Sequence, residues 1–344
     1  MRAVDAARSL TEPWSLGRLR VPNRLLLAPL AGIGNWFVRL QAKRYGAGMA
    51  VSEMVSSHAI HHRNERTMRE LLRIDERERP SGPVAIQLFG EDPEIMRSAA
   101  AHVAGLGVDA IDINMGCPVP KVRKTGAGAE LLADPDRAVA LACAAVEGAG
   151  GADGVPVMAK LRSGLRAGET SGVALAHRLV GEAGVSAIAF HPRSAAVHHK
   201  GVPDYELARQ LVADLPAPVI LTGGLSDARA VRDAFAQTGA TAVMLARGAL
   251  GNPWLFAELC GTRARPPGRD EVLDELDWTI DAAVEHLGAE RAGRYLRKFY
   301  PWYIERLGLD RGAARELQEG LQSAPELHDA RALLGTLREP AAVA

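Results

Sequence analysis

The sequence has few of the features that tie a protein to a membrane or to an oxidising compartment. It contains only three cysteines, Cys117, Cys143 and Cys260, and they lack the spacing of a disulfide framework. A sparse, odd set of this kind indicates a reducing compartment. No apolar run approaches the roughly 18 residues of a membrane-spanning helix, and residues 1–11 are polar, without an apolar signal core. We therefore expect a soluble, cytoplasmic protein with no membrane partner.

An excess of charge of either sign is also absent. Lys and Arg together number 41, and so do Asp and Glu, which gives a formal net charge of zero. The molecule as a whole is therefore not a basic nucleic-acid binder, and any such binding requires a local patch. Aromatic residues make up only 5 % of the chain, but the apolar share of 47 % suffices for a sizeable core. The length of 344 residues suits a large α/β barrel with an added domain.

Short apolar runs alternate with longer amphipathic stretches along most of the chain. The eight apolar runs are residues 24–28, 49–53, 84–88, 110–114, 157–161, 187–190, 219–221 and 242–245. They lack polar alternation, which indicates parallel strands buried on both faces. Between them, helices are predicted at 93–106, 135–147, 173–183 and 227–238; Asp92-Pro93 and Asp134-Pro135 are typical helix starts. We predict a (β/α)8 TIM barrel; the alternative, a doubly wound sheet, is disfavoured because no Gly-x-Gly-x-x-Gly follows the first strand.

The composition changes near residues 263–268, which read Arg-Ala-Arg-Pro-Pro-Gly and indicate a linker. Beyond it, residues 270–337 have a helical pattern without strand-like runs. We predict a TIM-barrel catalytic domain at residues 1–262 and a small all-α domain at residues 263–344.

The most informative segment is residues 112–118, Asp-Ile-Asn-Met-Gly-Cys-Pro. Gly116 and Pro118 stop the strand, so Cys117 is expected on the loop at its C-terminal end, where TIM barrels carry function. Asn114 precedes the thiol and three cations follow it: Lys121, Arg123 and Lys124. An ordinary thiol is mostly protonated at neutral pH and can act as an acid, whereas nearby cations favour a thiolate nucleophile. The residues alone leave both roles open.

Glycine-rich turns follow the seventh and eighth strands, at Gly223-Gly224 and at Arg247-Gly248. Backbone N–H groups at these turns form the usual phosphate site of a TIM barrel, and Arg247 adds a charge; the alternative is that the glycines only make tight turns. Lys160 interrupts an otherwise apolar fifth strand. It either pairs with a carboxylate or meets an electron-rich ligand. Together with a phosphate site, it favours flavin mononucleotide (FMN).

These motifs together resemble the tRNA-dihydrouridine synthases, most closely the bacterial B-type subgroup. The matching segments are residues 28–32, 52–55, 86–90, 112–118 with Lys121, 160–162, 191–193 and 247–254, and the resemblance extends over residues 22–302. It implies an FMN-binding TIM barrel followed by a helical tRNA-binding domain. NADPH would reduce the flavin, flavin N5 would deliver hydride to C6 of a uracil in tRNA, and Cys117 would protonate C5.

The resemblance also implies roles for individual residues. The flavin would be held by Pro29, Leu30, Ala31, Gln87, Lys160, His191, Gly223, Gly224, Ala246 and Arg247. The uracil side would be lined by Asn114, Arg162, His191 and Arg193, and Lys121, Arg123 and Lys124 would contact tRNA. The chain departs from the family pattern in having Leu30 where Met is commoner, and Thr222-Gly223-Gly224 where Asn-Gly-Asp is frequent.

Four cations, Arg291, Arg294, Arg297 and Lys298, recur at helical spacing in the C-terminal region. They form either a surface salt-bridge stripe or a phosphate-binding face, and the resemblance favours the second, with Arg294 and Arg297 as tRNA contacts. His58, His61 and His62 have near-metal spacing, but no cysteine or carboxylate set completes a site, so no metal is expected. We expect a monomer.

Two rival functions remain. A flavoenzyme acting on a small molecule such as free uracil or dihydroorotate would not need the basic loop after Cys117 or the C-terminal domain. A non-catalytic RNA-binding descendant is expected to have lost Cys117 or Lys160, and both are present.

Overall fold

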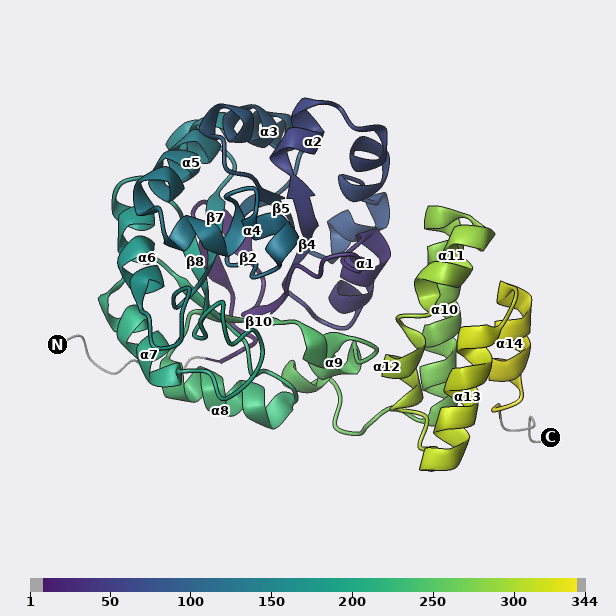
Figure 1. Ribbon diagram of the computed structural model, residues 1–344. Helices are drawn as coiled ribbons and strands as arrows, with labels where there is room; N and C mark the ends of the chain where they lie inside the picture. The colour runs from purple at the N-terminus through teal and green to yellow at the C-terminus, as the bar shows by residue number, and fades with distance from the viewer. Residues whose placement is uncertain (1–8, 339–344) are drawn as a thin grey trace. The chain divides into compact units, whose positions relative to one another are not determined.

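The computed structural model of the protein describes residues 9–338. Its centre is a closed barrel of parallel strands in the order β10-β3-β4-β5-β6-β7-β8-β9 (Figure 1). The strands are β3 (Leu25–Leu27), β4 (Met49–Ser56), β5 (Val84–Phe89), β6 (Ala110–Met115), β7 (Val157–Arg162), β8 (Ala187–His191), β9 (Val219–Thr222) and β10 (Ala242–Leu245). Each corresponds to one of the eight predicted runs, so the predicted TIM barrel is confirmed.

Helices cover the outside of the barrel (Figure 1). They are α1 (Trp36–Arg44), α2 (Ser57–His61), α3 (Pro93–Gly105), α5 (Pro135–Gly148), α6 (Ser171–Gly181), α7 (Tyr205–Asp214) and α8 (Ala228–Thr238). The short helix α4 (Pro120–Arg123) belongs instead to the loop after β6. Shorter helical turns are η1 (Thr67–Leu71), η2 (Glu76–Ser81), η3 (Gly128–Leu132), η4 (Gly151–Asp153) and η5 (Arg247–Ala249). The predicted helix starts are confirmed: Asp92 and Asp134 cap α3 and α5 by accepting backbone N–H bonds at 3.0 and 3.1 Å, which satisfies otherwise unpaired donors of the first turn.

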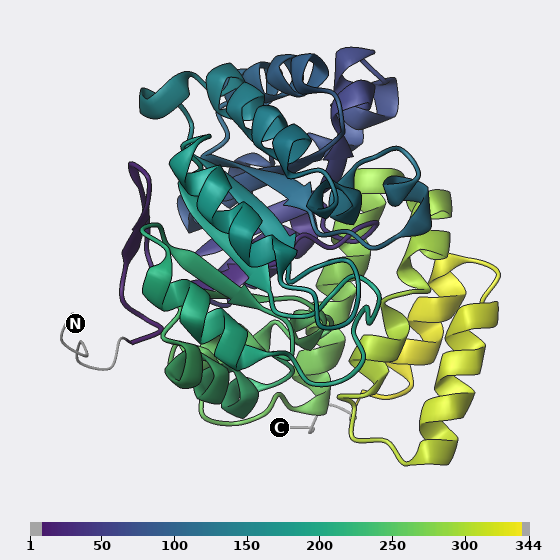
Figure 2. The same ribbon diagram turned by 60° about the vertical axis from the view of Figure 1, so that its left-hand side comes forward.

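An antiparallel hairpin that the sequence pattern did not reveal precedes the barrel. It consists of β1 (Trp14–Leu16) and β2 (Leu19–Val21) (Figure 2). Trp14, Leu16 and Val21 are buried in the same apolar cluster as the barrel interior. Its strands have only three residues each, with polar Ser15 or Arg20 in the centre, so neither forms an apolar run like that of β3.

The barrel interior is apolar toward the N-terminal ends of the strands and polar at their C-terminal ends, which we call the mouth. Its buried interior cluster takes alternate residues from each strand, including Met49, Ala85, Ala110, Met158, Ala187 and Ala242. Because side chains along a strand alternate between the two faces, Asp112 and Lys160 continue the inward rows of Ala110 and Met158. The next inward positions therefore gather polar side chains at the C-terminal ends of the strands.

The chain divides into two compact units, Met1–Gly248 and Ala249–Ala344. The described part of the second unit contains α9 (Trp254–Leu259), α10 (Arg269–Leu287), α11 (Ala289–Leu296), α12 (Tyr300–Ile304), α13 (Arg311–Ser323) and α14 (Leu327–Gly335). The predicted helical C-terminal region is thus confirmed. The predicted linker at 263–268 lies between α9 and α10, inside this unit. The assignment of residues 1–262 and 263–344 to catalytic and tRNA-binding domains stays a prediction, and residues 1–8 and 339–344 lie outside the described chain.

None of the helices between residues 9 and 338 is long and apolar enough to cross a membrane.

Candidate active site

A chain of side-chain hydrogen bonds runs across the barrel mouth and ends on the backbone of Cys117. Gln87 Nε2 donates to Asp112 Oδ2 at 2.6 Å, and Asn114 Nδ2 donates to Gln87 Oε1 at 2.9 Å. Asn114 Oδ1 then accepts from the backbone N–H groups of Gly116 and Cys117 at 3.2 and 2.9 Å. The predicted residues Gln87, Asn114 and Cys117 are therefore brought together, and strands β5 and β6 jointly set the position of the thiol loop.

The loop that carries Cys117 is held from its other side as well. The backbone N–H of Ala129 donates to the Cys117 carbonyl at 3.0 Å. Gly128 has a φ of +63°, and a Cβ there would lie 2.9 Å from the same carbonyl oxygen, so only glycine suits this close approach. Cys117 itself is half-buried, and Cys143 is exposed on α5. The structure therefore offers Cys117 as a partly exposed thiol on a firmly bonded backbone.

Asp112 belongs to the site, although the sequence reasoning assigned it no role. Its side chain is fully buried, and burial raises its pKa to about 7, against the opposing effects of the Gln87 hydrogen bond and the Lys160 charge. Burial likewise lowers the pKa of Lys160 to about 8, with Arg162 acting in the same direction and Asp112 opposing it. The signal was available, because Asp112 interrupts an apolar strand just as Lys160 does.

The guanidinium of Arg162 holds backbone rather than side chains. Arg162 is buried at 3 % exposure. Its Nε donates to the carbonyl of Gly116 at 2.9 Å, and its Nη1 donates to the carbonyls of Ser194 and His198 at 3.1 and 2.8 Å. Burial lowers the pKa of Arg162 to about 10, so the group is still a cation at neutral pH. Arg162 thus links two loops of the mouth through Nε and Nη1, and its predicted contact with the uracil stays a prediction.

His191 is buried at the end of β8 and is kept neutral. Burial lowers its pKa far below the ordinary value, and the charges of Lys160, Arg162 and Arg193 act in the same direction. Arg193 Nη1 lies 3.3 Å from His191 Nε2. Because a guanidinium can only donate, Nε2 must accept, which assigns the ring proton to Nδ1. His191 is therefore available as a neutral donor through Nδ1.

Three buried polar atoms at the mouth have no hydrogen-bond partner among residues 9–338: Asp112 Oδ1, Arg193 Nε and Ser194 Oγ. Buried polar atoms are normally paired. An unpaired group in a barrel mouth is therefore a place where a polar ligand or an ordered water completes the hydrogen bonds.

The turn after β9 has the backbone of an anion site. Gly223 and Gly224 have φ values of +97° and +79°, and a Cβ on either would collide with the His191 ring or with the Tyr205 hydroxyl. The Tyr205 hydroxyl donates to the Gly223 carbonyl at 3.0 Å and steadies the turn. Arg247, after β10, is exposed, and within the described chain its guanidinium has no hydrogen-bond or ion-pair partner. Glycine-only backbone beside an unpaired guanidinium fits a phosphate group.

The turn after β3 contains the predicted flavin contacts Pro29, Leu30 and Ala31. Pro29 is half-buried, Leu30 is buried and Ala31 is exposed. Glu53 Oε2 accepts from the N–H of Gly32 at 2.8 Å, and Arg39 Nη1 donates to the carbonyl of Gly34 at 3.1 Å. Ala246, the corresponding position after β10, is half-buried.

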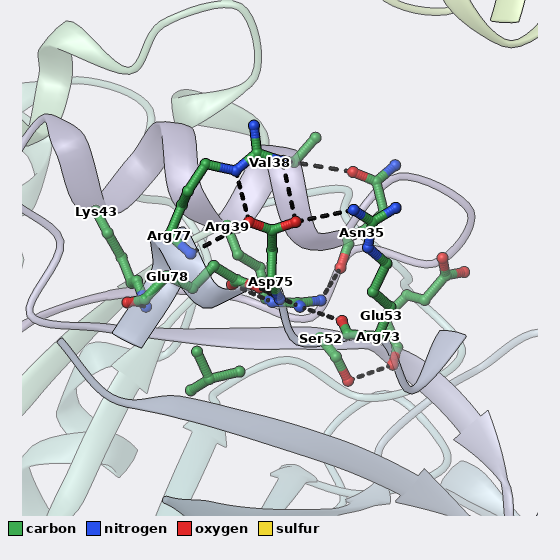
Figure 3. A network of polar contacts seen from close by, with 12 residues as sticks. Asn35, Val38, Arg39, Lys43, Ser52, Glu53, Arg73, Asp75, Arg77 and Glu78 are labelled. Atoms are coloured by element: carbon green, nitrogen blue, oxygen red, sulfur yellow. Dashed lines mark hydrogen bonds and ion pairs between the residues drawn. The ribbon is translucent and has the colours of Figure 1, made fainter. Parts of the chain in front are cut away.

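The sequence did not predict a buried ion pair between Arg39 and Glu78 that lies near this turn (Figure 3). Arg39 Nε and Nη2 each donate to one oxygen of Glu78 at 2.8 Å, and the two side chains are 1 % and 0 % exposed. Lys43 Nζ donates to the carbonyls of Glu78 and Gly82 at 2.5 and 2.7 Å, and burial lowers its pKa to about 8. The network fastens η2 to α1 and, through Gly34, supports the turn after β3.

The three predicted tRNA contacts after Cys117 differ in whether their charge is already paired with a carboxylate. Lys121 and Lys124 are exposed at α4 and have no ion-pair partner among the described residues. Arg123 instead pairs with Glu130, with Nε and Nη2 at 2.9 and 2.7 Å from Oε2. The charge of Arg123 is therefore already balanced, and Lys121 and Lys124 are the better polyanion contacts.

In the second unit, Arg294 and Arg297 line one cavity of about 710 Å³ beside α11, together with Tyr300 and His328. Arg294 pairs with Glu290 at 3.1 Å, and Arg297 Nη2 lies 3.4 Å from the carbonyl of Ala324. Lys298 instead stacks on the ring of Tyr295 at 4.2 Å. The expected common face of four cations is thus divided, and only Arg294 and Arg297 share the cavity.

Of the two histidines of α2, His58 contacts a carboxylate: its Nε2 lies 2.9 Å from Glu91 Oε1. The described chain contains no group of three or more His, Cys, Asp or Glu side chains that could hold a metal ion.

The fold and the polar mouth define a (β/α)8-barrel enzyme. The family model described as "Dihydrouridine synthase (Dus)" matches residues 26–336. The chain belongs to the dihydrouridine synthase family and is an oxidoreductase, as the sequence motifs predicted.

Curated relatives agree with this assignment. The chain is 34 % identical over 295 residues to tRNA-dihydrouridine synthase B of Xanthomonas campestris pv. campestris, covering 84 % of this chain and 86 % of the relative. It is 35 % identical over 298 residues to a probable tRNA-dihydrouridine synthase of Rhodobacter capsulatus, covering 85 % and 89 %. Among solved structures, morphinone reductase superposes with a TM-score of 0.54 at 18 % identity, over 76 % of this chain and 92 % of that chain. That likeness shows the barrel fold.

Proposed function

We propose that this chain reduces the 5,6 double bond of particular uridines in tRNA, with FMN as its bound cofactor and NADPH as the reductant. The observation that carries the proposal is the partly exposed thiol of Cys117, held by Asn114 at a barrel mouth that also contains Lys160 and a glycine-only turn. Family membership and the names of the curated relatives supply the substrate class.

The residues at the mouth fit FMN in two respects. The Gly223-Gly224 turn and the unpaired guanidinium of Arg247 suit the phosphate. The isoalloxazine ring would be held by Pro29, Leu30, Ala31, Gln87, Lys160, His191 and Ala246. Bound FMN would supply the hydride, delivered from N5 to uracil C6. Lys160 would stabilise negative charge on the ring, because its side chain is half-buried and its ammonium has no hydrogen-bond partner among the described residues.

In this proposal Cys117 holds the proton that is transferred to C5 of the base. Asn114 and Ala129 fix the backbone of Cys117, so the sulfur is positioned without help from the substrate. The neutral ring of His191 does not compete as an acid near neutral pH. The target base must leave its stack to enter the mouth, as in other base-modifying enzymes, and Asn114 and Arg193 would meet its polar edge.

Transfer RNA would be contacted by Lys121 and Lys124 beside the mouth and by Arg294 and Arg297 in the second unit. Arg123 would contribute less because its ion pair with Glu130 is half-buried, whereas the pair of Arg294 with Glu290 is exposed and exchanges more easily for a phosphate. These patches suit a chain whose overall charge is zero. The cytoplasmic location and the monomeric state stay predictions.

The deciding experiment incubates the FMN-loaded protein with NADPH and unmodified tRNA and then analyses the nucleosides by mass spectrometry. Dihydrouridine at defined positions is expected. Parallel reactions contain free uracil in place of tRNA, or dihydroorotate with NADP⁺ as electron acceptor in place of tRNA and NADPH. Turnover of either small molecule without reaction on tRNA would identify the rival small-molecule flavoenzyme, and a protein that takes up no FMN would exclude flavin chemistry.

Replacing Arg294 and Arg297 together by glutamine should weaken tRNA binding and flatten its salt dependence. Each lost phosphate contact reduces the slope of log K against log salt by about 0.9 for duplex contacts. Binding is measured by fluorescence anisotropy across a salt series. Arg315→Gln is the matched control, because Arg315 is an exposed helical cation paired with Glu319 on α13. An unchanged slope in the double variant would remove the cavity beside α11 from the tRNA interface.

A further inference from the structure

Arg162 connects the loop of the thiol to the loop after the neighbouring strand β8. It ends β7 and pairs in register with His191 of β8. One side of its guanidinium bonds the carbonyl of Gly116, the residue before Cys117. The other side bonds the carbonyls of Ser194 and His198. Three N–H groups of this buried guanidinium therefore form hydrogen bonds to backbone carbonyls of two loops.

The peptide unit between Gly116 and Cys117 is hydrogen-bonded through both its carbonyl and its N–H group. Asn114 accepts from the N–H of Cys117, and Arg162 donates to the carbonyl of Gly116. A peptide unit bonded through both groups cannot rotate without breaking one of them. Arg162 therefore controls the orientation in which the backbone presents the Cys117 side chain.

The second loop held by Arg162 is strained. His198 has a φ of +53°, a left-handed conformation that non-glycine residues avoid. Its carbonyl is the acceptor at 2.8 Å from Arg162 Nη1. The next residue, His199, stacks on His191 with ring centroids 6.2 Å apart. The hydrogen bond from Arg162 thus helps to hold a turn that places a second imidazole over the buried histidine.

We propose that Arg162 is a positioning residue that clamps the Cys117 loop and the 194–199 turn together. The clamp orients the thiol and keeps the turn with His199 over His191. It acts on the backbone, so it needs the fork of a guanidinium rather than positive charge alone. The kinetic part of this inference rests on the proposed function, whereas the structural part does not.

The first test is amide hydrogen exchange of Arg162→Lys in the protein without FMN, NADPH or tRNA. Lysine keeps the charge but cannot serve three carbonyls in the geometry of the fork. Exchange should become at least about tenfold faster in peptides covering 115–119 and 194–200, because both loops lose their clamp. Arg166→Lys is the matched control, since Arg166 lies in the loop after β7 and its side chain is 88 % exposed. Unchanged protection in Arg162→Lys would overturn the clamp, whatever reaction the enzyme catalyses.

The second test separates positioning from substrate binding. With NADPH-reduced enzyme and tRNA, the clamp predicts that kcat of Arg162→Lys falls by about 100-fold while KM for tRNA stays near the wild-type value. A raised KM with an unchanged kcat would instead make Arg162 a uracil contact and overturn the proposal.

A rescue variant tests the strained turn directly. Glycine at residue 198 adopts a positive φ without strain, so Arg162→Lys combined with His198→Gly should recover protection at 194–200 but not at 115–119. Recovery at neither loop would contradict the role assigned to His198. Should Arg162→Lys fail to fold by circular dichroism, Arg162→Gln, whose amide retains two N–H donors, should give intermediate exchange at both loops; wild-type exchange in that variant would overturn the clamp.

Discussion

Cys117→Ala should still bind FMN and accept electrons from NADPH, yet form no dihydrouridine in tRNA. The thiol is the only group at the mouth that the proposal assigns to protonate C5, and a positioned acid contributes roughly 10²–10⁴-fold to a reaction of this kind. The alanine side chain leaves the backbone bonds of residue 117 to Asn114 and Ala129 in place. The cofactor site should therefore be unchanged.

Stopped-flow absorbance separates the two half-reactions. Reduction of the flavin by NADPH should match the wild type, whereas reoxidation of the reduced flavin by tRNA should be lost. Cys143→Ala, which removes an exposed thiol on α5, is the control and should behave as wild type in both. If tRNA still reoxidises the reduced flavin of Cys117→Ala at the wild-type rate, another group donates the proton. If the variant loses FMN, Cys117 is a structural residue.

Glu78→Gln should destabilise the barrel by about 3–5 kcal/mol, the usual cost of leaving one partner of a buried ion pair without its counter-charge. Glu78 accepts two hydrogen bonds from Arg39 and one from the N–H of Asp75, all in a buried environment (Figure 3). A glutamine amide would turn a donor toward the Arg39 guanidinium, which can only donate. Urea unfolding followed by circular dichroism measures the change.

Two further variants serve as controls for the stability change of Glu78→Gln. Arg39→Met combined with Glu78→Met removes the guanidinium that Glu78→Gln leaves without a counter-charge, so part of the lost stability should return. Recovery should be incomplete, because buried Lys43 loses the nearby charge of Glu78 and the carbonyls of Gly34 and Arg73 lose their donor. Glu206→Gln breaks an exposed pair with Arg209 on α7 and should leave the unfolding midpoint in place. Equal midpoints for Glu78→Gln and Glu206→Gln would show that the buried pair adds nothing to stability. Since Arg39 also holds the Gly34 carbonyl, Glu78→Gln should in addition weaken FMN binding through the turn after β3.

The sequence predicted the elements of the barrel well because each depends on local pattern. Apolar runs of three to five residues, Asp-Pro helix starts and glycine stops are readable without knowing which elements meet. The predicted strand runs agree with β3–β10, and the family motifs predicted the family that the comparisons confirm. The hairpin β1–β2 was missed because each of its short strands has a polar residue in the centre and so forms no apolar run.

Other features depend on which side chains meet, and local pattern does not contain that. Arg39 and Glu78 are separated by 39 positions in the chain. The local sequence around either residue does not indicate that they form an ion pair. Arg162 was expected to line the uracil side, and its bonds to backbone carbonyls could not be foreseen because the acceptors lie on loops 46, 32 and 36 positions away. The charge of Arg123 was correctly noticed, whereas its neutralisation by Glu130 required the conformation of the loop.

The sequence by itself determined the parallel barrel, the helical C-terminal region, the family and the thiol at the end of β6, because strand periodicity and contiguous motifs encode them. The tertiary structure alone decided how the polar groups of the mouth are used. It buried Asp112 beside Gln87, left Lys160 without a hydrogen-bond partner in the described chain, and directed Arg162 to backbone carbonyls. Hydrogen bonding and desolvation depend on distances between residues far apart in the chain, and those distances exist only once the barrel has closed.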